Sequence, residues 1–228
     1  MAFLASASNA TAVPMFADNE KQAAFISPLE DWNPTWHTEE YVSLLENAGY
    51  HVDFVLGENA SISFLKTRLG DYDLIILRTD SFTYEGNNFY CSGEAATFEA
   101  RKTYANEIED GQIQVAACVG FNALLISNSY PAGSLRRGLV TVLDGYSADL
   151  GQAFIEAGEA AFVGYYDDAY SLSWGRLDAL SLQWLKYASQ GYSIKESVLM
   201  LYGYLNRGHG ETASWPALFY YGEAEFKI

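Results

Sequence analysis

The sequence predicts an α/β fold, a three-layer αβα sandwich built on a mostly parallel β-sheet. Short apolar runs alternate with amphipathic segments along most of the 228 residues, which is the pattern of strands that alternate with helices. The run at 72–78 is almost continuously apolar, as expected of a strand buried on both faces. Half of the residues are hydrophobic, which is enough for one large core.

The elements of this fold are expected along residues 21–228, after an extended arm at 1–20 that lacks clear periodicity. Apolar residues spaced by three and four indicate helices, and short apolar or alternating runs indicate strands. We expect strands at 22–27, 51–56, 72–78, 138–143, 160–164 and 217–221, and helices at 38–47, 61–69, 147–157, 175–189 and 194–207.

Local signals set the ends of these elements. Pro28 halts the first strand, and Gly49 ends the first helix. Ser61 and Ser193 are the expected caps of the helices that follow them. Gly158 ends the third helix.

The middle of the chain is less regular. Residues 84–92 are rich in Gly and Asn and predict a loop. Residues 97–107 and 112–118 predict a β-hairpin insertion that turns at 109–111. A short helix is expected at 121–127.

Charge and sequence motifs limit the partners and the compartment. The chain has 29 acidic and 13 basic residues, for a net charge of −16, and such a surface repels the phosphates of nucleic acids. No apolar run reaches the ~18 residues expected of a membrane helix. Glycosylation sequons at Asn9 and Asn59 favour an extracellular or cell-surface protein. Cys91 and Cys118 form either a disulfide or two buried thiols.

Four segments, taken in their order and spacing, carry a resemblance to a known family. They are YDLIILRTDS at 72–81, LVTVLDGYS with DLGQAFIEAG at 139–158, AFVG at 161–164 and LFYYGEAEF at 218–226. Over residues 20–228 the chain resembles the caspase/gingipain-type cysteine peptidase superfamily, particularly its gingipain-like (C25-type) and CHAT-like branches. The resemblance implies a caspase-like fold in which the first two segments end beside each other.

In that family a cysteine thiolate attacks a carbonyl carbon and a histidine acts as the base. The resemblance implies that Asp80 stands at the His position and Tyr146 at the Cys position. A phenol with an ordinary pKa of ~10 is a poor nucleophile for peptide bonds. The histidines lie elsewhere, with His37 before the first helix, His51 at the start of a strand and His209 in a Gly-rich loop. We therefore expect no peptidase activity by the family mechanism.

Carboxylates follow several of the expected strands. The carboxyl ends of parallel strands meet at one edge of a sheet, and Ca²⁺ takes six to eight oxygen ligands. The resemblance also implies calcium, which several gingipain-like relatives carry. Alternatively, these residues only cap helices and turns, where Asp is common. The candidate cation ligands are Asp31, Asp80, Asp144, Asp167 and Asp168.

Aromatic and hydroxyl side chains are expected at the same edge. They fit either a groove for a peptide or a sugar, or a contact with a neighbouring subunit, where Tyr and Trp are favoured. The apolar arm segment at 12–16 fits strand addition to a neighbour, or a disordered tail. The binding candidates are Trp32, Trp36, Ser81, Ser147, Tyr165 and Tyr166.

Three hypotheses follow. In the first, the protein is a non-catalytic, caspase-like structural or assembly subunit that self-associates outside the cell. In the second, it is a hydrolase that uses altered residues, with Asp80 or Asp144 as the base. In the third, the former active-site edge binds a peptide, a glycan or a cation.

Overall fold

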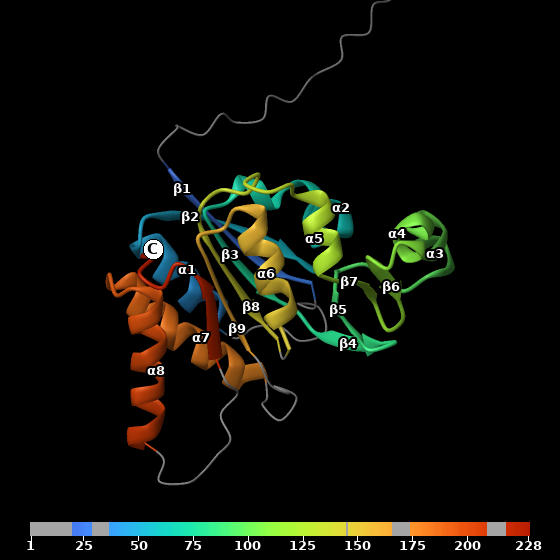
Figure 1. The fold of residues 1–228 in the computed structure, drawn as a ribbon. Coiled ribbons are helices and arrows are strands. Elements are labelled where there is room, and N and C mark those ends of the chain that lie inside the picture. Colours follow the sequence, from blue (N-terminus) through green and yellow to red (C-terminus); the bar gives the residue numbers. More distant parts are fainter. Residues whose placement is uncertain (1–19, 29–36, 145, 166–173, 209–217) are drawn as a thin grey trace, which may run out of the picture.

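The computed structural model describes residues 20–28, 37–144, 146–165, 174–208 and 218–228. Within these ranges a six-stranded sheet lies between two layers of helices, as Figure 1 shows. This confirms the predicted α/β class and its three layers. The arm expected at 1–20 lies outside the described residues, apart from Glu20.

The strand order of the main sheet is β10-β9-β8-β3-β1-β2. The strands from β9 to β2 are parallel, and β10 is antiparallel to β9. The sheet consists of β1 (Lys21–Ser27), β2 (Tyr50–Leu56), β3 (Leu74–Arg78), β8 (Leu139–Leu143), β9 (Ala161–Tyr165) and β10 (Leu218–Gly222).

Each face of the sheet has its own apolar core. Phe25, Tyr41 and Trp184 are wholly buried on one face, and Phe154 packs on Phe162 on the other. Three helices contribute to the first core, namely α1 (Thr38–Asn47), α7 (Trp174–Ser189) and α8 (Ile194–Gly208). The second core is covered by α2 (Ile62–Thr67), α5 (Ala123–Ser129) and α6 (Ala148–Ala157), with short 3₁₀ turns at Gly57–Asn59 and Leu69–Asp71.

The capping predictions are confirmed. Ser61 Oγ accepts a hydrogen bond from Phe64 N at 3.2 Å at the start of α2. Ser193 Oγ accepts one from Glu196 N, and the Glu196 carboxylate accepts one from Ser193 N at 2.8 Å. This reciprocal pair is a capping box, which satisfies two amides at the start of α8. Gly158 ends α6 with φ of +123°.

The middle of the chain forms a second, four-stranded antiparallel sheet in the order β4-β5-β7-β6. The prediction of a loop at 84–92 was wrong. Strands β4 (Ser81–Tyr84) and β5 (Asn87–Cys91) form a hairpin there. Glu85 and Gly86 turn it with φ of +50° and +81°, and positive φ at both central residues matches the twist of the flanking strands.

The hairpin predicted over 97–118 was wrong in its first half, which folds as α3 (Phe98–Thr103) and α4 (Ala105–Glu109). Thr97 Oγ1 accepts a hydrogen bond from Ala100 N at 3.0 Å and caps α3. The second half is strand β6 (Ile113–Val115), which pairs with β7 (Val119–Phe121). The predicted helix at 121–127 begins two residues later, because Phe121 belongs to β7.

In the part of the chain that the structure describes, no helix combines the length and the apolar character that crossing a bilayer requires.

A buried carboxyl group lies at the amino-terminal end of the parallel strands. Glu159 is 5% exposed, and its Oε2 accepts a hydrogen bond from Gly138 N at 2.9 Å. Its Oε1 is buried without a hydrogen-bond partner among the described residues. Burial, reinforced by the charge of Asp73, raises the pKa of Glu159 to about 8.

This carboxyl group should make stability depend on pH. Between an unfolded pKa of ~4.3 and the folded value, the native state holds one proton more, so stability falls as pH rises. The slope approaches about 1.4 kcal/mol per pH unit. Glu159→Gln should remove this decline in stability. Above pH 8 it should unfold at a higher denaturant concentration than the wild type, as measured by chemical denaturation from pH 5 to 9.

The matched control is Glu156→Gln, because Glu156 is an exposed carboxylate in the last turn of α6, three residues before Glu159. It should keep the wild-type pH profile. An unchanged profile in Glu159→Gln would show that Glu159 is ionised in the folded protein.

Candidate functional site

The two positions that the resemblance identifies follow neighbouring strands of the main sheet. In the parallel ladder between β3 and β8, Arg78 stands opposite Leu143. Asp80 comes two residues after Arg78, and Tyr146 comes three residues after Leu143. The structure thus brings both positions to the carboxyl edge of the sheet, where ligands gather in parallel α/β folds.

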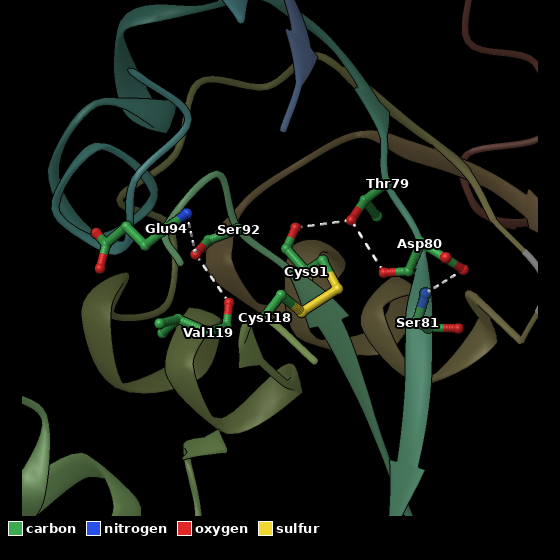
Figure 2. The surroundings of a disulfide bond; sticks show 8 residues. All are labelled: Thr79, Asp80, Ser81, Cys91, Ser92, Glu94, Cys118 and Val119. Atoms are coloured by element: carbon green, nitrogen blue, oxygen red, sulfur yellow. Dashed lines mark hydrogen bonds between the residues drawn. A yellow bond between two sulfur atoms is a disulfide. The ribbon is translucent and has the colours of Figure 1, made fainter. Parts of the chain in front are cut away.

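The turn at Asp80 holds the second sheet in place. Asp80 Oδ1 accepts a hydrogen bond from Ser81 N at 2.9 Å, and its carbonyl accepts one from Cys91 N at 2.8 Å. Thr79 Oγ1 donates to the Cys91 carbonyl at 2.7 Å (Figure 2). The half-buried Asp80 carboxylate is therefore bonded within its own turn, and Ser81 is the first residue of β4.

The turn at Tyr146 is a tight connection from β8 to α6. Tyr146 has φ of +60°, a left-handed conformation that is costly for a non-glycine residue. Its side chain is 39% exposed, and its carbonyl accepts a hydrogen bond from Tyr90 Oη at 2.6 Å. On the neighbouring part of β5, Asn88 Nδ2 donates a hydrogen bond to Asp149 Oδ2 of α6 at 3.1 Å. The second sheet is thereby attached to the ends of both β3 and β8.

Two of the binding candidates lie in the core and not on the exposed edge. Ser147 Oγ is fully buried and accepts a hydrogen bond from Tyr165 N at 2.8 Å. A Cβ on Gly164 would lie 2.5 Å from this oxygen, so the glycine makes room for it. Tyr165 is 1% exposed, and its Oη is hydrogen-bonded to Ser181 Oγ at 2.9 Å. Burial raises the pKa of Tyr165, which keeps its phenol neutral.

A buried ion pair lies directly below this edge. Arg78 Nε donates to Asp178 Oδ1 at 3.1 Å, and the two residues are 1% and 2% exposed. Arg78 Nη1 also donates to Ser27 Oγ at 3.5 Å, and Tyr41 Oη donates to the Asp178 carbonyl at 3.2 Å. The group joins the ends of β1 and β3 to α1 and α7. Sequence reasoning missed it, since the partners are 100 residues apart.

The proposed cation ligands are only partly described. Asp144 is 4% exposed at the end of β8, and Asp80 is half-buried after β3. Among the described residues no cluster of three or more His, Cys, Asp or Glu side chains is arranged to hold a metal. The remaining edge candidates, Asp31, Asp167, Asp168, Trp32, Trp36 and Tyr166, lie outside the described residues.

The two cysteines of the chain form one disulfide. Cys91 ends β5, and Cys118 immediately precedes β7, the strand that pairs with it (Figure 2). The bond cross-links the end of β5 to the start of β7, beside the Asp80 turn. Sequence reasoning left the pairing open, because the strand that presents Cys91 was taken for a loop.

The described histidines lie beside carboxylates of their own segments. His37 Nδ1 is 3.3 Å from Glu40 Oε1 at the start of α1, and His51 Nε2 is 3.7 Å from Asp53 Oδ1 on β2. His51 stands opposite Gln22, near the amino-terminal end of the sheet and away from Asp80. His209 lies outside the described residues.

Asn59 is exposed in the short turn before α2, and the hydroxyl of its sequon residue Ser61 caps that helix. Asn9 lies outside the described residues.

Comparisons with known proteins add little to this geometry. No family model matches the chain, and no curated protein matches it. Among solved structures, one similar chain is described as the crystal structure of the Drosophila initiator caspase Dronc. The match has 11% sequence identity and a TM-score of 0.46, and it covers 94% of this chain and 84% of that one. At this level the similarity bears on neither activity nor binding.

The buried ion pair gives a stability test. Asp178→Ala should lose about 3–5 kcal/mol of unfolding free energy, because it leaves the Arg78 charge buried without its counter-ion. The double variant Arg78→Met/Asp178→Leu should recover most of that loss, since apolar residues of similar volume replace the pair. Denaturant titration measures both. Equal losses in the two variants would mean that packing around Asp178, and not its charge, is what matters.

The disulfide gives a second test. Cys91→Ser/Cys118→Ser should lower the unfolding free energy by about 3 kcal/mol, because the bond closes a loop in the unfolded chain. Amide hydrogen exchange should accelerate in the hairpin 81–91 more than in β3. Equal acceleration in the hairpin and in β3 would contradict a local role for the bond.

Proposed function

We propose that this protein is a catalytically inactive relative of the caspase/gingipain-type peptidases that acts as a self-associating structural subunit outside the cytoplasm. One observation carries the proposal. The only two cysteines of the chain form a disulfide, so no thiolate is available to attack a carbonyl carbon.

The two strand-end positions support the inactive assignment. Asp80 and Tyr146 replace the imidazole and the thiol, and the backbone at both positions holds the second sheet. The described histidines, His37 and His51, lie beside carboxylates of their own segments. The imidazole base and the thiolate nucleophile by which the family carries out acyl transfer are therefore not found among the described residues of this edge.

The location and the association rest on other features. A structural disulfide is typical of oxidising compartments, and the exposed sequon at Asn59 fits the same setting. Large apolar side chains are exposed near the margins of the fold, with Phe54 on β2 41% exposed and Leu199 and Tyr204 on α8 close to 60%. Exposed aromatic and aliphatic side chains of this kind suit contacts between subunits.

The proposal predicts concentration-dependent assembly without thiol reactivity. Sedimentation velocity over a wide concentration range should show a mass that rises above 25.2 kDa. An electrophilic thiol probe should label the folded, non-reduced protein no more than a Cys91→Ser/Cys118→Ser variant. Asp80→Asn/Tyr146→Phe should assemble like the wild type, because it leaves the exposed apolar side chains Phe54, Leu199 and Tyr204 unchanged.

Two results would contradict it. A monomer at every concentration would remove the subunit role. Turnover of peptide substrates that is lost in Asp80→Asn/Tyr146→Phe would show that the edge is catalytic after all.

A further inference from the structure

Strand β2 forms an open margin of the main sheet. It pairs with β1 along all seven of its residues, and it is the last strand in the sheet order. On its outer side no other described strand pairs with it. Half of its main-chain groups therefore face outward, which is a template for another strand.

The sequence of β2 lacks several of the devices that usually protect such an edge. Tyr50 to Leu56 reads YHVDFVL, without lysine, proline or glycine. Tyr50, Val52 and Phe54 lie on the face covered by α1, and the Phe54 side chain is 41% exposed. His51 and Asp53 lie on the opposite face, with side chains 55% and 42% exposed.

We propose that two copies of this chain pair through β2 in an antiparallel fashion, around a two-fold axis that passes through Val52 perpendicular to the sheet. This inference rests on the proposed function and names the surface through which the subunits associate. The two six-stranded sheets become one continuous sheet. Such an axis keeps the α1 layers of both copies on the same side, so facing residues share the same face of the sheet.

A match between carboxylate and imidazole selects Val52 as the centre. In this register each His51 faces Asp53 of the second copy, and each Tyr50 faces Phe54 of the second copy. An imidazole can donate a hydrogen bond to the carboxylate that it faces, and aromatic pairs that face each other across strands are favourable. Within one copy, His51 Nε2 lies 3.7 Å from Asp53 Oδ1. The dimer adds the same kind of contact between the two copies.

The neighbouring registers lack this match. A centre at Asp53 places two carboxylates face to face, which is unfavourable. A centre at His51 places Asp53 opposite Gly49, and a centre at Phe54 places His51 opposite Gly57. Among the two-fold registers that overlap this strand, only the one through Val52 pairs each Asp53 carboxylate with an imidazole.

A charge-swap experiment tests both the strand and the register. His51→Asp gives a strand with two acidic positions, and His51→Lys/Asp53→Lys gives one with two basic positions. Each variant alone should have a dimer dissociation constant raised about 100-fold or more, because like charges then face each other. An equimolar mixture should form heterodimers with an affinity close to that of the wild type, as measured by sedimentation equilibrium.

Cross-linking locates the axis. Val52→Cys should give a covalent dimer on mild oxidation, because facing Cα atoms in an antiparallel pair lie within disulfide reach. Phe54→Cys is the matched control on the same face and should not cross-link, because its own copy is displaced by four residues along the partner strand. Thermal melts followed by circular dichroism establish that each variant is folded.

The possible outcomes distinguish the β2 contact from self-association through another surface. A wild-type dimer whose affinity is unchanged by these substitutions, and which dissociates on Tyr220→Lys, would place the contact on β10. That result would overturn the β2 assignment and leave self-association standing. Wild-type protein that stays monomeric would overturn both.

Discussion

The buried ion pair between Arg78 and Asp178 is the constraint on which the arrangement of the layers depends. Two charges taken out of water are tolerated only when each keeps its partner, so the end of β3 and helix α7 must meet in one geometry. Ser27 and Tyr41 add hydrogen bonds from β1 and α1. The pair therefore fixes how one helical layer sits against the sheet, immediately beneath the carboxyl edge where a parallel α/β fold usually places its chemistry.

On the other side of that edge, the second sheet attaches at Asp80 and Tyr146, the two positions that the sequence resemblance identifies. The Asp80 carbonyl accepts a hydrogen bond from Cys91, and the Tyr146 carbonyl accepts one from Tyr90. The disulfide between Cys91 and Cys118 then closes the second sheet itself. In the function proposed above, these polar groups and the disulfide hold the second sheet to the main sheet and take no part in acyl transfer.

The main sheet was predictable because its signals are local. Strand β3 is apolar on both faces, and Ser61 and Ser193 cap their helices as their positions suggested. The second sheet was missed because its signals conflict. Gly and Asn near 86–88 mark a turn, and the predicted loop at 84–92 extended that turn over strand β5. The Thr97 cap was overlooked among residues that favour helix. The Arg78–Asp178 pair, the disulfide and the burial of Ser147 and Tyr165 join distant parts of the chain, so no window of sequence reveals them.

Net charge explains why a strand edge is a suitable contact for this protein. At −16 per copy, broad faces repel each other over roughly a Debye length, about 8 Å in physiological salt. The proposed association therefore requires a contact that is short-ranged and directional. Main-chain groups of an edge strand are uncharged and pair along a line, and the single carboxylate of β2, Asp53, stands two residues from His51. In the proposed Val52-centred dimer, Asp53 of each copy faces His51 of the other copy. The strand therefore joins two acidic subunits without placing like charges opposite each other.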